Sequence, residues 1–224
     1  MSDRSKRLII AIDGPSGAGK GTISRTIAQH LGYCHVDTGA MYRAVGWKAT
    51  HDGVPLDDEA RVAAIAQQAE LTCERGVVII DGHDVTTHIR TPEMDKAASA
   101  VARLPKVRAA LVARQQKMGE NGGVVMEGRD IGTVVFPDAD LKIYLDASAE
   151  ERARRRVNDP AHSGAHTGQA AVAAAIDARD QSDKTRTASP LTLAADAVHI
   201  DTTDLPIDQV VSRVLELVDE KVHR

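Results

Sequence analysis

Residues 11–27, AIDGPSGAGKGTISRTI, decide the fold of this 224-residue chain. An apolar run, RLIIAI, leads into the stretch and predicts a buried strand of a parallel sheet. After it, Ile23, Ile27 and Leu31 recur at helical spacing, and Gly32 is typical of a residue that ends a helix. The stretch therefore predicts a strand, a glycine-rich loop and a helix in direct succession.

The loop fits the phosphate-binding pattern of a glycine, four residues, a glycine and a lysine, here Gly14, Gly19 and Lys20. Without Cβ atoms, successive backbone N–H groups can turn toward phosphate oxygens, and the start of a helix adds a partial positive charge. The Lys20 ammonium would reach the outer phosphates. A glycine-rich turn before a helix, with no ligand, is the alternative, and the flanking strand and helix favour phosphate binding.

The usual pattern has serine or threonine directly after the lysine, whereas here Gly21 intervenes and Thr22 follows. Magnesium prefers oxygen ligands, so Thr22 is a candidate Mg²⁺ ligand despite its shifted position.

Composition restricts the class of protein. The formal net charge is −4 and aromatic residues make up 2% of the chain, which argues against a nucleic-acid partner. Cys34 and Cys73 lie far apart without metal-binding spacing, which favours a reduced, cytoplasmic protein. The N-terminal apolar run is too short for a signal peptide or a membrane span. We expect one domain, a monomer, with no membrane partner.

Apolar runs alternate with helical patterns along the chain, which predicts an α/β fold with a mostly parallel sheet. The further strands are expected at 33–37, 123–127, 141–147 and 197–201, with helices at 40–53 and 207–222. Residues 51–98 contain short β-like runs joined by glycine turns and predict a small antiparallel insertion. Residues 158–169 predict a mobile lid tip, in which His162 and His166 are expected to be loop residues rather than metal ligands.

Ser148 and Glu151 form a capping box, so we expect a helix to begin there. Arg152, Arg155 and Arg156 share one face of that helix, and Arg154 lies to the side. A solvated face paired with Glu150 and Glu151 is the alternative. Beside a flexible loop and a phosphate loop, these arginines can close over a triphosphate and exclude water.

Two further groups of charged residues are candidate binding residues. Arg179, Asp183 and Arg186 project from one helical face, although ordinary surface ion pairs would also explain that spacing. Glu127, Arg129 and Asp130 directly follow an apolar strand, where open α/β sheets bind ligands, and a polar turn is the alternative.

Thr38 and Arg43 lie near the start of a helix that follows another strand. Thr38 is either a ligand of the substrate or an N-cap.

Six segments in one order, IDGPSGAGKGT, DTGAMYR, LPKVR, EGRDIGTVVFPDA, RARRR and RDQSDKTR, resemble the bacterial cytidylate kinase family over nearly the whole chain. The resemblance implies a three-layer P-loop NTPase fold, with a core at 1–50 and 99–224. It implies an insertion that binds the nucleoside monophosphate at about 51–98, and an arginine-rich lid at about 150–170. The implied reaction is Mg-dependent transfer of the γ-phosphoryl group of ATP to CMP, and to dCMP, giving CDP or dCDP and ADP.

The resemblance also implies roles for individual residues. ATP would be held by Gly14, Pro15, Ser16, Gly17, Ala18, Gly19, Lys20, Gly21 and Thr22. Cytosine would be surrounded by Ser99, Arg108, Asp130 and Arg186, and the sugar by Thr38, Arg179 and Asp183. The acceptor phosphate would be held by Arg43 and Arg129. The implied catalytic residues are Lys20, Arg129, Arg152, Arg155 and Arg156.

Thr38 and Glu127 stand where family members often carry serine and aspartate, so the preference between CMP and dCMP stays open. A carboxylate at Asp130 would accept a hydrogen bond from the cytosine amine but would oppose the uracil carbonyl. That mismatch costs about 1 to 3 kcal/mol, which predicts that UMP is a poorer substrate.

Two other functions compete with this prediction. A kinase of another acceptor, such as AMP, UMP or shikimate, would use the same phosphate loop. A non-enzymatic nucleotide switch is disfavoured, because the sequence contains no Asp-x-x-Gly or Asn-Lys-x-Asp element and its arginines suit a second phosphate.

Overall fold

The computed structural model describes residues 7–74, 76–159 and 168–223. Its centre is a five-stranded parallel sheet with the strand order β2-β6-β1-β7-β8. The strands are β1 (Ile9–Asp13), β2 (Cys34–Asp37), β6 (Val124–Gly128), β7 (Leu141–Asp146) and β8 (Val198–Asp201). Each expected core strand is present, and the predicted mostly parallel sheet is confirmed.

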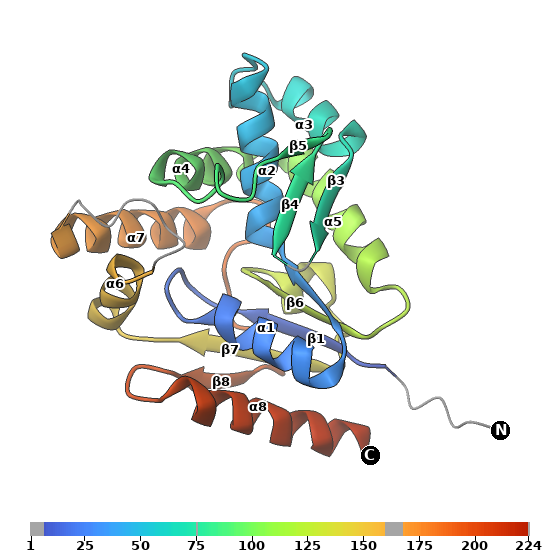
Figure 1. The fold of residues 1–224 in the computed structure, drawn as a ribbon, viewed down its shortest axis with the longest axis vertical. Helices are drawn as coiled ribbons and strands as arrows, with labels where there is room; N and C mark the ends of the chain where they lie inside the picture. The colour runs from blue at the N-terminus through green and yellow to red at the C-terminus, as the bar shows by residue number, and fades with distance from the viewer. Residues whose placement is uncertain (1–6, 75, 160–167, 224) are drawn as a thin grey trace.

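Helices cover both faces of the sheet and make three layers (Figure 1). On one face lie α1 (Lys20–Leu31) and α8 (Ile207–Val222), and on the other lie α2 (Thr38–His51), α5 (Pro105–Gly119) and the short helical turn η1 (Ile131–Val135). Successive side chains of β1 point to opposite faces of the sheet. Ile10 and Ile12 pack with α1 and α8, whereas Ala11 packs with α2 and α5. The central strand is therefore buried on both sides.

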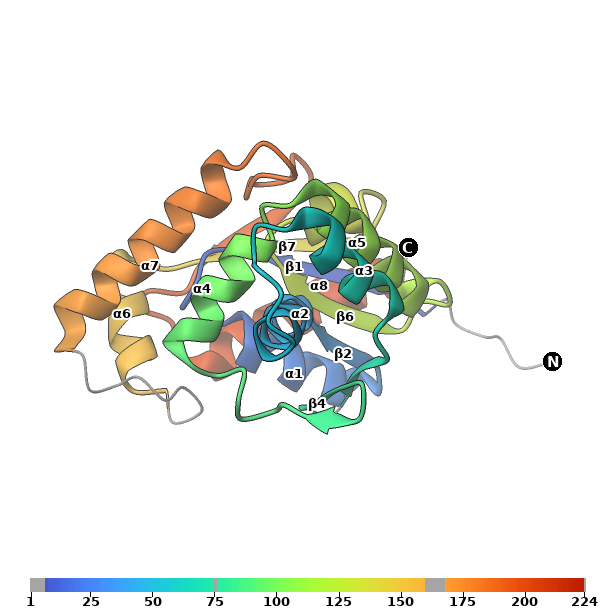
Figure 2. The same ribbon diagram turned by 90° about the horizontal axis from the view of Figure 1, so that it is seen from above.

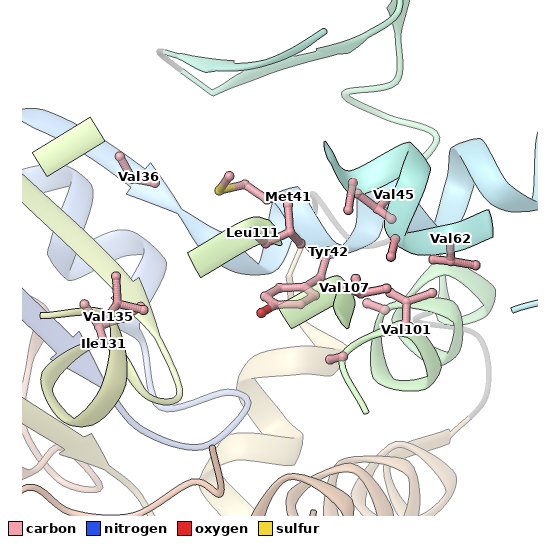
Figure 3. Close-up of a cluster of buried hydrophobic side chains, with 14 of the residues drawn as sticks. Val36, Met41, Tyr42, Val45, Val62, Val101, Val107, Leu111, Ile131 and Val135 are labelled. Carbon is pink, nitrogen blue, oxygen red and sulfur yellow. The ribbon is translucent and has the colours of Figure 1, made fainter. Parts of the chain in front are cut away.

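The core around α2 extends from the sheet into the insertion (Figure 3). Met41 and Tyr42 of α2 share one buried cluster with Leu111 of α5 and with Val62 and Val101 of the insertion. The insertion is thus packed onto the same hydrophobic core that supports the carboxyl edge of the sheet.

The insertion contains the expected antiparallel piece and two helices. Strands β3 (Leu71–Glu74), β4 (Val77–Ile80) and β5 (His83–Asp84) form a small antiparallel sheet. Helix α3 (Glu59–Gln68), which the sequence analysis did not predict, precedes that sheet, and α4 (Pro92–Val101) follows it across the expected boundary near residue 98. Figure 2 shows α4 beside α7, so the insertion faces the arginine-rich helices.

Those helices are α6 (Ala149–Val157) and α7 (Gly168–Thr185). The predicted start of α6 at Ser148 is confirmed, because the Glu151 backbone N–H donates to Ser148 Oγ at 3.3 Å. The other half of the capping box does not form, since the Ser148 N–H donates to Thr203 and the Glu151 carboxylate accepts from Arg154 and Arg155. The expected lid tip, with His162 and His166, lies for the most part outside the described residues. Within the described ranges, no helix combines the length and apolar character that crossing a membrane requires.

Candidate active site

A cleft of about 1230 Å³ opens where the phosphate loop meets the carboxyl ends of β2 and β6 and the arginines of α6 and α7. This edge is the expected ligand site of an open parallel sheet. Many of the predicted site residues line it: Ser16, Gly17, Gly19, Lys20, Gly21, Thr22, Arg43, Arg129, Arg155, Arg156 and Arg179. The cleft therefore joins the predicted donor half to part of the predicted acceptor half.

The phosphate loop needs its glycines for geometric reasons. Gly14, Gly17 and Gly19 have φ values of 146°, 82° and 89°, in a region that favours glycine. A Cβ on Gly14 would lie 2.0 Å from the Leu145 carbonyl oxygen, so the loop packs directly against β7. Helix α1 begins at Lys20 without a side-chain cap, which leaves its first N–H groups available to an anion.

Lys20 lies buried beneath the loop, where its Nζ donates to the Pro15 carbonyl at 2.7 Å. Burial, together with the neighbouring positive charge of Arg129, lowers the pKa of the Lys20 ammonium to about 7. Phosphate oxygens in the loop would favour the charged form and raise that pKa again.

Asp13 is a buried residue of the site that the sequence analysis did not identify. Its carboxylate accepts hydrogen bonds from the backbone N–H groups of Ile131 and Gly132, each at 2.8 Å. Burial raises the pKa of Asp13 to about 6. Asp13 ends β1 and η1 follows Arg129 and Asp130, so this carboxylate joins the phosphate loop to the acceptor residues. An acidic residue at the end of an apolar strand, directly before Gly14, was the available signal.

The residues predicted to surround cytosine lie together behind the cleft. Arg108 forms a buried ion pair with Asp130, and Arg186 Nη2 lies 3.6 Å from Asp130 Oδ1. Among the described residues, Arg108 Nε, Arg186 Nη2 and the Tyr42 hydroxyl have no hydrogen-bond partner. Ser99 is on α4 and half-buried, and no hydrogen bond described for the chain joins it to the other three. The cluster has free donors and a carboxylate, as recognition of a polar base requires.

Arg43 and Arg179 are held by carboxylates that the sequence analysis did not identify. Arg43 Nη2 donates to Asp37 at 3.1 Å, and Arg179 Nη1 donates to Asp95 of α4 at 2.9 Å. Burial alone would raise the pKa of Asp37. The Arg43 and Arg90 guanidiniums outweigh burial and hold that pKa well below its usual range. In both Arg43 and Arg179, Nε is buried and has no partner among the described residues. Each guanidinium is therefore fixed on one side and keeps a free donor.

Arg129 and Asp183 pair with each other across the sheet edge, with 3.0 Å between Nε and the Asp183 carboxylate. Asp183 thus contacts the residue after β6, and it also lies 3.6 Å from Arg186, three residues further on. Asp183 and Arg186 are both buried, so the alternative of surface ion pairs is wrong. Thr38 donates from Oγ1 to the Glu127 carbonyl at 2.7 Å. Asp37, rather than Thr38, caps α2, so the N-cap alternative for Thr38 is wrong.

The arginines of α6 lie against the phosphate loop. Arg152 Nη1 donates to the Ser16 carbonyl at 3.1 Å, and Arg156 Nη2 donates to Ser16 Oγ at 2.8 Å. Arg155 donates to a threonine hydroxyl just after β8 at 2.9 Å. Arg154 points away, with 60% of its side chain exposed. The predicted face of Arg152, Arg155 and Arg156 is thus directed inward, and the alternative of a solvated face is wrong for these three arginines. Its expected pairing with Glu151 is present, since Arg154 and Arg155 both contact that carboxylate at 2.7 Å.

Comparison with known proteins gives the same family by two routes. A family model described as Cytidylate kinase matches residues 10–220. A curated cytidylate kinase of Desulfitobacterium hafniense is 50% identical over 97% of this chain and 95% of its own length. One of Solibacter usitatus is 46% identical over 99% of this chain and 97% of its own length. The structure of a shikimate kinase from Bacteroides thetaiotaomicron aligns with a TM-score of 0.52 at 13% identity, covering 95% of this chain and 98% of that one. This last likeness shows the fold alone.

Proposed function

Because the chain belongs to the cytidylate kinase family, we propose that its cleft binds ATP at the phosphate loop and CMP between β6, α4 and α7. The enzyme is a (d)CMP kinase, which transfers the γ-phosphoryl group of ATP to the monophosphate. The observation that carries the assignment of the two halves is that Arg43 and Arg179, whose buried Nε atoms have no hydrogen-bond partner among the described residues, line the same cleft as the uncapped start of α1. Family membership over almost the full chain disfavours AMP, UMP and shikimate as principal acceptors.

The donor half is residues 14–22. We assign the β- and γ-phosphates of ATP to the N–H groups of the loop and of the first turn of α1, with Lys20 as their cationic partner. The positive φ values support this assignment, as does the lack of room for a side chain at Gly14 and Gly17, because both features belong to a loop that turns its backbone toward a ligand.

Oxygen donors that suit magnesium lie beside this loop. Thr22 contributes a hydroxyl at the cleft wall, and the buried Glu127 carboxylate faces Gly21, at 3.5 Å from the place of a Cβ there. Mg²⁺ commonly takes one or two protein oxygens together with waters and phosphate oxygens. We propose that Thr22 and Glu127 hold it, and when bound the ion neutralises charge on the phosphates.

The acceptor half recognises base, sugar and phosphate separately. Asp130 accepts from the cytosine amine, with Arg108, Arg186 and Ser99 around the ring. Thr38 and Asp183 lie near the sugar together with Arg179, and Arg43 and Arg129 bind the acceptor phosphate. The fixed orientation of Arg43 and its free Nε support its assignment to the phosphate.

The transfer needs no catalytic base. The second pKa of a phosphate monoester is about 6, so the attacking oxygen of CMP is already largely ionised at neutral pH. The protein must bring two anions together in line and stabilise the charge of the transferring group. Lys20, Arg129, Arg152, Arg155 and Arg156 supply the positive charge, while the lid excludes water that would otherwise accept the phosphoryl group.

Every residue in this scheme comes from one chain, so we propose that the enzyme works as a monomer. Its partners would be nucleotides rather than nucleic acids, and its place of action the cytoplasm, where ATP and CMP are available. Light scattering at micromolar protein concentration tests the monomer proposal, and a mass equal to that of a dimer would contradict it.

Replacement of Lys20 tests the donor site. Lys20→Ala should lower kcat by at least about 100-fold, the magnitude expected when one preorganised electrostatic donor is removed. The exposed Lys117→Ala on α5 makes the same charge change and should leave kcat unchanged. Turnover is measured by ADP release and folding by circular dichroism, and near-normal turnover in a folded Lys20→Ala protein would contradict the assignment.

A further inference from the structure

Ser16, at the tip of the phosphate loop, is held by α6 and α7 through all three of its polar atoms. Its backbone N–H donates to Asp180 Oδ1 at 3.2 Å, and its carbonyl accepts from Arg152 Nη1 at 3.1 Å. Its Oγ accepts from Arg156 Nη2 at 2.8 Å, and the residue is 4% exposed. The shape of the loop tip is therefore set by side chains of two helices that follow it by more than 130 residues.

Asp180 of α7 holds two of the groups at this junction. One carboxylate oxygen accepts from Ser16 N–H, and the other forms an ion pair with Arg152. The residue is 3% exposed. Arg179 and Asp183, on either side of it in α7, pair instead with Asp95 and Arg129 of the acceptor half. Asp180 therefore contacts the proposed ATP site, whereas Arg179 and Asp183 of the same helix contact residues of the proposed CMP site.

The contact of α6 with the loop leaves little freedom. A Cβ on Gly17 would lie 2.9 Å from both Cβ and the carbonyl oxygen of Arg152. Arg152 also donates from Nε to the Ala147 carbonyl at 3.1 Å, so its guanidinium is bound by three acceptors once Asp180 is included. Without the Asp180 carboxylate, Arg152 Nη1 would lose its charged partner and keep only the Ser16 carbonyl, and the Ser16 N–H would lose its partner inside a buried site.

We propose that Asp180 is a positioning residue, which holds Arg152 and the loop tip at Ser16 in the one arrangement that binds the donor triphosphate. Both of its oxygens are occupied by protein groups, so it acts through Arg152 and Ser16 and does not touch substrate. The inference rests on the ATP site proposed above. It predicts that loss of this carboxylate weakens the donor side of the reaction and largely spares recognition of CMP.

Asp180→Asn tests this, because the amide keeps the size of the side chain and removes its charge and one acceptor. We expect kcat/KM for ATP to fall at least tenfold and the Kd for ATP without CMP, measured by calorimetry, to rise. The KM for CMP should change less than threefold. Asp177→Asn, one turn earlier on α7 and exposed, makes the same chemical change and should leave all these constants unchanged.

A purely stabilising role for Asp180 would lower the melting temperature and leave the kinetic constants of the folded protein alone. That result, or an equal loss for ATP and CMP, overturns the proposal. Asp180→Glu is the second variant, in case the asparagine protein does not fold. It keeps the charge opposite Arg152 but shifts the carboxylate by one methylene, and we expect a smaller loss confined to the donor side. Donor constants equal to wild type in this variant would also overturn it.

These results separate the inference from the proposed function. If Lys20→Ala abolishes turnover while Asp180→Asn keeps normal ATP constants, the ATP site stands and the role of Asp180 is wrong. If Lys20→Ala is fully active, the ATP site itself is wrong, whatever Asp180→Asn does.

Discussion

At the scale of single residues, Arg43 and Arg179 of the acceptor half are each held by a carboxylate through one nitrogen and keep another nitrogen without a hydrogen-bond partner among the described residues. The carboxylate is Asp37 for Arg43 and Asp95 for Arg179, and the second nitrogen is Nε in both arginines. A guanidinium has five donors in a rigid fork, so it can be oriented by one carboxylate and still bind an anion. This division explains why carboxylates are needed in a site that binds anions.

Asp130→Asn tests base recognition. The amide can donate to the uracil carbonyl where the carboxylate could only accept, so discrimination between CMP and UMP should weaken. Loss of the ion pair with Arg108 will reduce activity toward both substrates, so the quantity to measure is the ratio of kcat/KM for CMP to that for UMP. We expect this ratio to fall about tenfold or more, equivalent to a change of about 1 to 3 kcal/mol.

An unchanged ratio in Asp130→Asn would mean that another group reads the cytosine amine. Asp138→Asn is a suitable control, because this aspartate is exposed and lies in the turn after η1. The ratio in that variant should equal that of the wild type.

Sequence analysis identified most of the charged residues of the site but not their partners. Arg43 and Arg129 could be recognised because they follow the ends of apolar strands, and Arg179 because it shares a helical face with Asp183 and Arg186, while their roles came from the family resemblance. Asp95 could not be assigned to Arg179, because only the packing of α4 against α7 brings the two together, whereas Asp37 lies six residues before Arg43 and was a local signal that the analysis did not use. Local spacing instead suggested a pair between Arg179 and Asp183, which the fold replaces with longer-range pairs.

At the scale of elements, the core strands were predicted from the sequence, whereas α3 and α4 of the insertion and α5 after it were not. Runs of branched apolar residues bounded by glycine or aspartate mark the five parallel strands, because both of their faces are buried. Helix α3 spans ten residues, of which Val62, Ala63 and Ala66 are buried, and it stands directly before the first β-like run. The β-like runs that follow it dominated the interpretation of residues 51–98.

The link between β1 and η1 depends on the ionisation of Asp13, which gives a prediction about stability. The pKa of Asp13 is about 6 in the folded protein and 3.8 in its ordinary state. Between these values the unfolded chain releases this proton and the folded protein keeps it, so the free energy of unfolding falls as pH rises. From pH 5 to pH 7 the ionisation of Asp13 should lower the free energy of unfolding by about 1 kcal/mol.

Asp13→Asn cannot titrate at this position, so it should lack that decrease. Urea unfolding gives the free energy of unfolding of the wild type and of Asp13→Asn at pH 5 and at pH 7. The difference between the two proteins should be smaller at pH 7 than at pH 5. The variant is expected to be less stable at both values, since its amide cannot accept both N–H groups that the carboxylate accepts. A difference that stays constant between the two pH values would contradict the raised pKa of Asp13.

At the scale of the whole molecule, several segments far apart in sequence converge on one cleft. The phosphate loop supplies the donor half, the ends of β2 and β6 with the insertion supply the acceptor half, and α6 and α7 join the two. The order of six motifs was sufficient to predict the family and the fold. The junction at Ser16 was not predictable, because Asp180, Arg152 and Arg156 meet it only through the packing of α6 and α7 on the loop.

In the proposed function, one cleft brings ATP together with a cytidine monophosphate. The most direct test follows ADP release from ATP and Mg²⁺ with CMP, dCMP, UMP and AMP offered separately to the wild-type enzyme. We predict the highest kcat/KM for CMP or dCMP, at least about tenfold above UMP because the Asp130 carboxylate opposes the uracil carbonyl. A higher kcat/KM for AMP or UMP than for both cytosine nucleotides would contradict the account.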